Sequence, residues 1–208
     1  MLTLAFDTTA ECGSVALVDR NHIIEEVLLE APRGFSMVLF GAIEALLARH
    51  HLTLRDIELF AGASGPGSFT GVRVGLAAIK GLAEVMGRPA TAVSNLAAIA
   101  ETGSAPLRAV AIDAHRGEVF AALYDDAGNI VVPEMVTPLE TFAARIAGFP
   151  DVQYVAAPRA LAAWIARIAI RQADAGGTVD PSSAASRASC VSRGAGAAAR
   201  GRWRGSFS

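Results

Sequence analysis

Two aspartates are the residues of this sequence best placed for carboxylate chemistry. Asp7 lies at the end of the apolar run LTLAFDT, and Asp113 ends the run RAVAID in the second part of the chain. Carboxylates at the ends of strands in two similar halves can face a central cleft, so both are candidate site residues. Each can equally be a strand-end aspartate that accepts hydrogen bonds from the N–H groups of its own turn.

A glycine-rich stretch, GASGPGSFTGVRVG at 62–75, is the second candidate site. Gly65, Gly67 and Gly71 approach a dinucleotide-binding fingerprint, but there is one residue too many before the last glycine. A Walker loop requires lysine after its final glycine, where this sequence has Val72. Neither phosphate motif fits, and only a generic anion on the free N–H groups at the start of the following helix stays open.

The helix after this stretch carries small residues along one face. Gly71, Gly75 and Ala78 share a stripe, because positions three and four apart lie on the same side of a helix. Each interior glycine costs about 1 kcal/mol relative to alanine, so the stripe needs a structural reason. Two reasons are open: packing against the chain's own sheet, or close approach of a second protein or a second copy. We favour a second protein, with Arg73 at the rim, and predict that Gly75→Leu disrupts the complex but leaves the monomer folded.

Other residues give no sign of catalysis or metal binding. Cys12 lies in a turn beside a glycine, which is typical of an inert thiol, and Ser68 has no assignable partner base. None of the histidines falls in a His-x-x-x-His or His-x-x-Glu-His spacing. They are His22, His50, His51 and His115. We predict no catalytic residue, no metal site and no cofactor of the chain's own.

Composition favours a cytoplasmic protein. The chain has 208 residues, a net charge of −2 and two cysteines in unrelated surroundings. This charge gives no whole-chain reason to expect nucleic-acid binding, and the cysteines do not suggest a disulfide framework. The sequence enters a strand directly, without the charged and apolar regions of a signal peptide. No apolar run is long enough to span a membrane.

Residues 181–208 differ in character from the rest of the chain. They contain five arginines and no acidic residue, which leaves a charge of −7 on residues 1–180. We expect this tail to be disordered, because it has too little apolar surface to offset the entropy of ordering. A basic arm that grips RNA phosphates is one alternative. Another is that the tail is translated out of frame.

The elements that must position these residues alternate along the chain. Hydrophobic periodicity and turn residues predict an antiparallel meander followed by alternating helices and strands, which means α/β layers. Strands are predicted at 2–8, 13–19, 22–30, 59–65, 91–94, within 108–132 and at 152–157. Helices are predicted at 36–49 with Ser36 as N-cap, at 68–86, from Ser94 to about 103, from a Thr137 capping box to 147, and at 159–173.

The chain also repeats itself with a shift of 106 residues. The shift places Asp7 on Asp113, Ala16 on Ala122, Leu17 on Leu123 and Asp19 on Asp125. An internal repeat of this length predicts two similar halves. The alternative is that short apolar hairpins simply resemble one another.

Three segments together resemble the bacterial TsaB (YeaZ) family: LAFDTTAECGSVAL at 4–17, GPGSFTGVRVG at 65–75 and AIDAHRGEVF at 111–120. The resemblance covers about 1–175 in order. It implies an α/β, actin-like (ASKHA) duplicated ribonuclease-H-type fold. Its parts are an N-terminal half at 1–104, a C-terminal half at 105–180, for which a complete and an incomplete form both stay open, and the tail at 181–208.

The resemblance also implies a function. Family members are non-catalytic scaffolds and activators of the TsaD-type subunit, which transfers a threonylcarbamoyl group to adenosine 37 of tRNAs that read ANN codons. A TsaE-type ATPase joins them, tRNA is reached through the complex, and ATP and metal are expected on the partner subunits. Carried onto this chain, the partner interface comprises Ser68, Phe69, Thr70, Gly71, Arg73, Val74, Gly75 and Ala78. A homodimer stays open.

The sequence also departs from the family in two places, and two other functions stay open. It has Arg33-Gly34-Phe35-Ser36 where relatives commonly have a histidine, and it lacks their Pro-x-Tyr-Leu-Arg-like end. The alternative functions are an actin-like ATPase or peptidase-like enzyme that acts alone, and a self-associating protein. Proteolysis and ATP turnover assays, together with co-purification with the TsaD-type protein, separate them.

Overall fold

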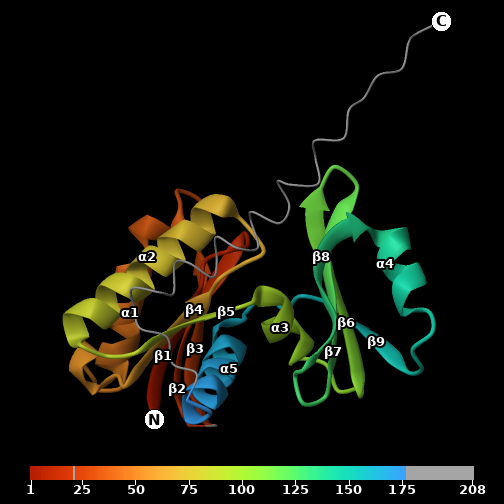
Figure 1. Cartoon of the computed structure of the whole chain (residues 1–208). Helices are drawn as coiled ribbons and strands as arrows, with labels where there is room; N and C mark the ends of the chain where they lie inside the picture. Colours follow the sequence, from red (N-terminus) through yellow and green to blue (C-terminus); the bar gives the residue numbers. More distant parts are fainter. Residues whose placement is uncertain (21, 177–208) are drawn as a thin grey trace, which may run out of the picture.

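The first part of the chain forms a five-stranded sheet. The computed structural model describes residues 1–20 and 22–176, and the strand order of this sheet is β3-β2-β1-β4-β5 (Figure 1). The strands are β1 (Leu2–Asp7), β2 (Cys12–Asp19), β3 (His22–Glu30), β4 (Leu59–Ala63) and β5 (Ala90–Val93). β1, β2 and β3 form the predicted antiparallel meander, whereas β4 and β5 run parallel to β1. β1 and β4 are almost wholly buried, because helices cover both faces of the sheet.

Helices connect these strands largely where the sequence predicts them. They are η1 (Phe35–Met37), α1 (Leu39–Arg49), η2 (Leu54–Asp56), α2 (Phe69–Met86) and α3 (Asn95–Ala100). The ends of α2 agree with the predicted range 68–86: the Ser68 hydroxyl accepts a hydrogen bond from the Gly71 N–H, and Gly87 ends the helix in the left-handed conformation. The predicted Ser36 cap is wrong, because Ser36 lies inside η1 and α1 starts after Val38 without a side-chain cap.

The second part of the chain forms a four-stranded sheet with the order β8-β7-β6-β9. Its elements are β6 (Leu107–His115), β7 (Glu118–Asp125), β8 (Ile130–Pro138), α4 (Leu139–Ile146), β9 (Val152–Val155) and α5 (Ala162–Asp174). The predicted capping box at Thr137 does not form. Thr137 is the penultimate residue of β8, and α4 starts after Pro138 without a side-chain cap.

The internal duplication is confirmed by the strand ranges and pairings. β2 and β7 occupy ranges 106 residues apart, and each is the middle strand of an antiparallel meander. In both sheets the next strand, β4 or β9, runs parallel to the first strand of the meander. The chain therefore has the predicted actin-like, duplicated ribonuclease-H-type fold. The predicted tail at 181–208 lies outside the described residues.

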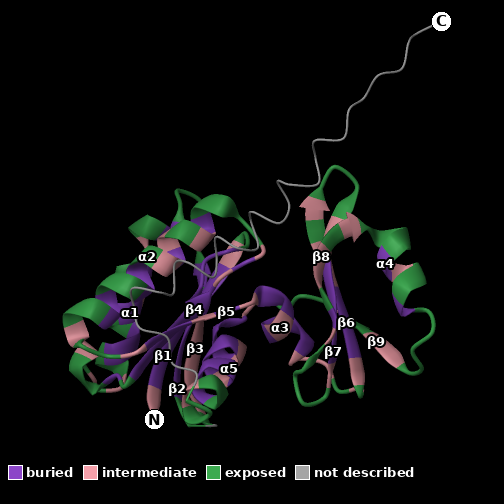
Figure 2. Ribbon diagram, viewed as in Figure 1, coloured by how far each residue is buried: buried purple, intermediate pink, exposed green. Residues whose placement is uncertain are grey.

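Two helices lie between the sheets and form the largest core with them. α3 and α5 bury apolar residues against β1, β2 and β4 on one side and β6 and β7 on the other (Figures 1 and 2). The start of α5 is held by the first sheet. The Ser14 hydroxyl accepts hydrogen bonds from the Leu161 and Ala162 N–H groups at 3.0 and 2.9 Å. α5, which the sequence assigns to the second half, thus packs on the first sheet.

The outer faces of the two sheets are covered differently. On the first sheet, α1 packs on β2 and β3 while α2 packs on β4 and β5. On the second sheet, α4 packs on β7 and β8, and the described residues supply no counterpart of α2 or β5. The reason is the length of the connections: residues 64–94 separate β4 from α3, but only 156–161 separate β9 from α5.

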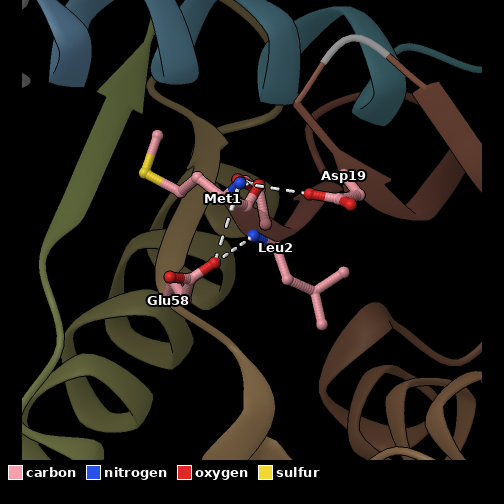
Figure 3. Close-up of polar contacts among 5 residues, drawn as sticks. Met1, Leu2, Asp19 and Glu58 are labelled. Carbon is pink, nitrogen blue, oxygen red and sulfur yellow. Dashed lines mark hydrogen bonds and ion pairs between the residues drawn. The ribbon is translucent and has the colours of Figure 1, made fainter.

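Polar contacts of Met1 and Leu2 link the ends of three strands at one end of the first sheet. The Met1 amino nitrogen lies 3.1 Å from the Asp19 carboxylate and 3.7 Å from that of Glu58 (Figure 3). The Leu2 N–H donates to the same Glu58 carboxylate at 2.6 Å. These carboxylates are about half exposed, so each ion pair contributes little to stability. The contacts connect the start of β1 with the end of β2 and with the residue before β4.

Candidate functional site

The turn between β1 and β2 is held by a buried aspartate. One carboxylate oxygen of Asp7 accepts hydrogen bonds from the Thr9 N–H at 2.8 Å and from the Thr9 hydroxyl at 2.6 Å. Asp7 is 5 % exposed, and Thr8 and Thr9 are buried with it. Burial raises the pKa of the Asp7 carboxyl above its ordinary value, although the two hydrogen bonds from Thr9 act in the opposite direction. Asp7 thus supports its own turn.

The start of α2 lies directly on this turn. The Ser68 N–H donates to the Thr9 carbonyl oxygen at 2.7 Å, and the Thr8 hydroxyl donates to the Gly71 carbonyl oxygen at 2.7 Å. A side chain at Gly71 would overlap the backbone carbonyl of Thr8, and one at Gly75 would lie 2.7 Å from the Thr8 hydroxyl. The glycines therefore let the backbone of α2 approach the backbone of the turn closely.

This contact corrects the prediction for the small-residue stripe. Gly71, Gly75 and Ala78 are buried inside the chain, against the turn and the first sheet, and are not available to a second protein. Gly75→Leu, predicted to spare the monomer, would collide with Thr8 of the same chain. Close packing by the stripe was anticipated, but its partner is the chain's own β1–β2 turn.

Other residues of the predicted interface are exposed. Ser68, Phe69, Thr70 and Arg73 lie on the solvent side of α2, and Val74 is half-buried. Phe69 is 69 % exposed, and the guanidinium carbon of Arg73 lies 3.8 Å from the centre of its ring. This stacking holds the aromatic ring and the cation together at the start of the helix.

The exposed side of α2 continues beyond the residues that the sequence analysis chose. Ala77 and Gly81 follow Arg73 at intervals of four on the same side, and an added side chain at Gly81 would meet open space. Met37 in η1 and Phe40 in α1 are also mostly exposed, and η1 packs beside α2. The four-residue spacing from Arg73 was the sequence signal that could have identified Ala77 and Gly81. We call Met37, Phe40, Phe69, Arg73, Ala77 and Gly81 the docking surface.

The second candidate carboxylate lies in a different environment. The Asp113 carboxylate accepts a hydrogen bond from the His115 N–H at 2.8 Å, and its side chain is 73 % exposed. β6 pairs one residue out of step with the 106-residue shift, since Asp125 faces Leu107 whereas Asp19 faces Leu2. An offset of one residue moves a side chain to the other face of a sheet.

The offset corrects the prediction that Asp7 and Asp113 face one central cleft. Asp113 alternates with Ala109 and Ala111, which belong to the outer core under α4. Asp7 alternates with Ala5, which belongs to the core between the sheets. The two carboxylates therefore lie on differently oriented faces, and each supports its own turn.

Residues 1–20 and 22–176 contain neither a metal-binding cluster nor a membrane-spanning helix. No group of three or more His, Cys, Asp or Glu side chains lies close enough together there to hold a metal ion. In the same part of the chain, no helix has the length and apolar character needed to cross a membrane. His50, for example, pairs with Glu25 at 2.8 Å, and this pair is not part of any such group among the described residues.

Comparison with known proteins gives consistent matches. The family model described as "TsaD: tRNA N6-adenosine threonylcarbamoyltransferase" matches residues 29–166. The tRNA threonylcarbamoyladenosine biosynthesis protein TsaB of Bacillus subtilis is 32% identical over 140 residues, 66% of this chain. The protein of the same name from Haemophilus influenzae is 38% identical over 124 residues, 56% of this chain. The solved structure of YeaZ from Pseudomonas aeruginosa matches with a TM-score of 0.72 and 26% identity, over 88% of this chain and 97% of that one.

The matched region is shorter than the curated relatives. It spans 60% of the Bacillus subtilis protein and 51% of the Haemophilus influenzae protein. The match therefore covers only part of each of these relatives.

Proposed function

Because this chain belongs to the TsaB (YeaZ) family, we propose that it serves the synthesis of N6-threonylcarbamoyladenosine in tRNA as a non-catalytic subunit. In this proposal it binds and activates a TsaD-type catalytic subunit, which transfers the threonylcarbamoyl group to adenosine 37 of tRNAs that read ANN codons. A TsaE-type ATPase joins the complex in the cytoplasm. ATP and metal bind to the partner subunits, and tRNA is reached through them.

The docking surface is the observation that carries this proposal. Met37, Phe40 and Phe69 are large apolar side chains, each more than half exposed, on neighbouring elements at one side of the first sheet. A cluster of exposed apolar side chains is typical of a protein–protein interface. Aromatic and arginine side chains are also the types that contribute most to binding energy.

The shape of the docking surface suits a helix of a partner. Ala77 and Gly81 leave a low strip along α2, with Phe69 and Arg73 standing at one end. Such a strip allows a second helix to approach at short distance, as small residues do elsewhere. The stacking of Arg73 on Phe69 reduces the side-chain entropy that binding must overcome.

The experiment is to measure the affinity of Phe69→Ala and Arg73→Ala variants for the TsaD-type protein of the same cell by calorimetry. We expect Phe69→Ala to weaken binding at least about tenfold, since truncation of an aromatic anchor at an interface typically costs about 2 kcal/mol or more. Tyr154→Ala is the matched control, because Tyr154 is an aromatic side chain in β9 that is 55 % exposed and lies in the other half. Its affinity should equal that of the wild type.

Three results would contradict the proposal. One is wild-type affinity in the Phe69→Ala variant together with weakened binding in the Tyr154→Ala variant, which would move the interface to the second half. Another is robust ATP hydrolysis or metal-dependent proteolysis by the purified chain alone, which would favour an enzyme that acts without a partner. The third is a homodimer that outcompetes the TsaD-type protein on the same surface.

A further inference from the structure

Asn95, the first residue of α3, connects three segments that are far apart in the sequence. Asn95 is 5 % exposed. Its side-chain oxygen accepts a hydrogen bond from the Gly65 N–H at 3.1 Å, and its own N–H donates to the Gly65 carbonyl oxygen at 2.8 Å. Its side-chain nitrogen donates to the Thr9 hydroxyl. One buried amide thus holds the β1–β2 turn and the turn before α2.

These two turns determine where α2 begins. Gly65 opens the turn that leads into Ser68, and the Ser68 N–H is fixed on the Thr9 carbonyl oxygen. Phe69 comes directly after Ser68, with Arg73 stacked on its ring. A change in the position of Gly65 or Thr9 would therefore move the exposed end of the docking surface.

The start of α3 is itself held by the second half. The Ser94 hydroxyl donates to the Glu134 carboxylate in β8, and the Tyr124 hydroxyl in β7 donates to the same carboxylate oxygen at 2.7 Å. α3 also packs on β6 and β7. Asn95 therefore belongs to a helix start that the second half holds in place. If the two turns shift, the Asn95 amide has little freedom to follow them.

We propose that Asn95 is a positioning residue for the docking surface, which fixes the start of α2 relative to the second half of the molecule. The inference rests on the proposed function for its binding readout. Its structural part stands on the hydrogen bonds of Asn95 alone. Loss of the amide leaves the Gly65 N–H and the Thr9 hydroxyl without this partner in a buried place, and the turns can then shift.

The test compares Asn95→Ala with Ser14→Ala in the full chain. Ser14 is a fully buried side chain of the same half, and its two hydrogen bonds go to α5 on the opposite face of the first sheet from α2. Both variants lose a buried hydrogen-bonding group, so both should lower the melting temperature. Affinity for the TsaD-type protein and amide hydrogen exchange, resolved by peptide, are measured for each.

We expect Asn95→Ala to bind at least about tenfold more weakly and to exchange faster at 65–72, while β2 and α5 stay protected. Ser14→Ala should bind within about twofold of the wild type and exchange faster near 161–163. Unchanged exchange at 65–72 in Asn95→Ala, or an equal loss of affinity in both variants, would overturn the inference. If the wild type does not bind at all, the proposed function fails, and exchange at 65–72 alone decides whether Asn95 positions α2.

Discussion

The β1–β2 turn of the first half and the β6–β7 turn of the second half contain the same local hydrogen bond in opposite surroundings. In each, an aspartate carboxylate accepts from the N–H two residues further on, at 2.8 Å, in the pairs Asp7–Thr9 and Asp113–His115. Yet Asp7 is 5 % exposed and the side chain of Asp113 is 73 % exposed. The same local hydrogen bond is thus buried in the turn of one half and exposed in the turn of the other.

The difference arises from the segment that the chain adds after each meander. The first turn is covered by the start of α2, which lies between β4 and β5, and by Asn95, which follows β5. The short connection 156–161 supplies neither to the second turn. The duplicated strands therefore fix the turn, whereas the inserted helix decides whether the turn is buried.

The largest difference in stability between the two turns is expected for substitution of Gly71, the glycine that lets α2 pack against the first turn. Gly71→Ala should destabilise the fold by about 3 kcal/mol or more, because the new methyl group meets the Thr8 backbone, which cannot move aside. Gly117→Ala in the second turn should cost about 1 kcal/mol, since Gly117 has open space but a φ of 80°. Urea denaturation of both variants measures the difference.

A control for helix propensity is available in α2 itself. Gly81 is an exposed glycine with open space around its α-carbon, so Gly81→Ala should stabilise the chain by about 0.5–1 kcal/mol. Equal effects of alanine at Gly71 and Gly81 would show that α2 does not rest on the turn as described.

Removal of the two aspartates should separate the halves by a smaller amount. Asp7→Ala leaves the Thr9 N–H and hydroxyl without their buried acceptor, which should cost about 2 kcal/mol. Asp113→Ala changes an exposed turn and should alter stability by about 0.5 kcal/mol or less. Thermal unfolding of the two variants checks this, and a larger loss for Asp113→Ala would reverse the assignment of the buried turn.

A change of pH should alter stability through the buried Asp7 carboxyl by a smaller amount than these substitutions do. Burial raises the pKa of Asp7 in the folded chain above its ordinary value of 3.8, so the folded state binds this proton more readily than the unfolded state. The wild type should therefore gain stability relative to Asp7→Asn as the pH falls through the folded pKa of Asp7 toward 3.8, and lose this gain as the pH rises. Denaturation of both proteins over a pH series measures the trend, and the opposite slope would contradict the burial of the ionised group.

Much of the fold can be predicted from local sequence. The meanders, the start of α3 at Ser94 and the end of the 68–86 helix depend on neighbours within a few residues, and the structure has them where they were predicted. The caps at Ser36 and Thr137 were wrong because Ser36 lies inside η1 and Thr137 lies in β8, where it pairs with Val119 of β7. The cap of α5 was not predictable in this way, since Ser14 lies in β2, far away in the sequence.

The amino-acid sequence indicates two similar halves and a face of α2 that lets another backbone approach closely. Which backbone this is depends on the folded chain. Glycine permits close approach but carries no chemical group that identifies its neighbour. From the sequence alone, the stripe at Gly71 and Gly75 therefore fits a partner helix and the chain's own turn equally well. The position of Thr8 above Gly71 resolves the choice, and it leaves Phe69 and Arg73 on the opposite, exposed side.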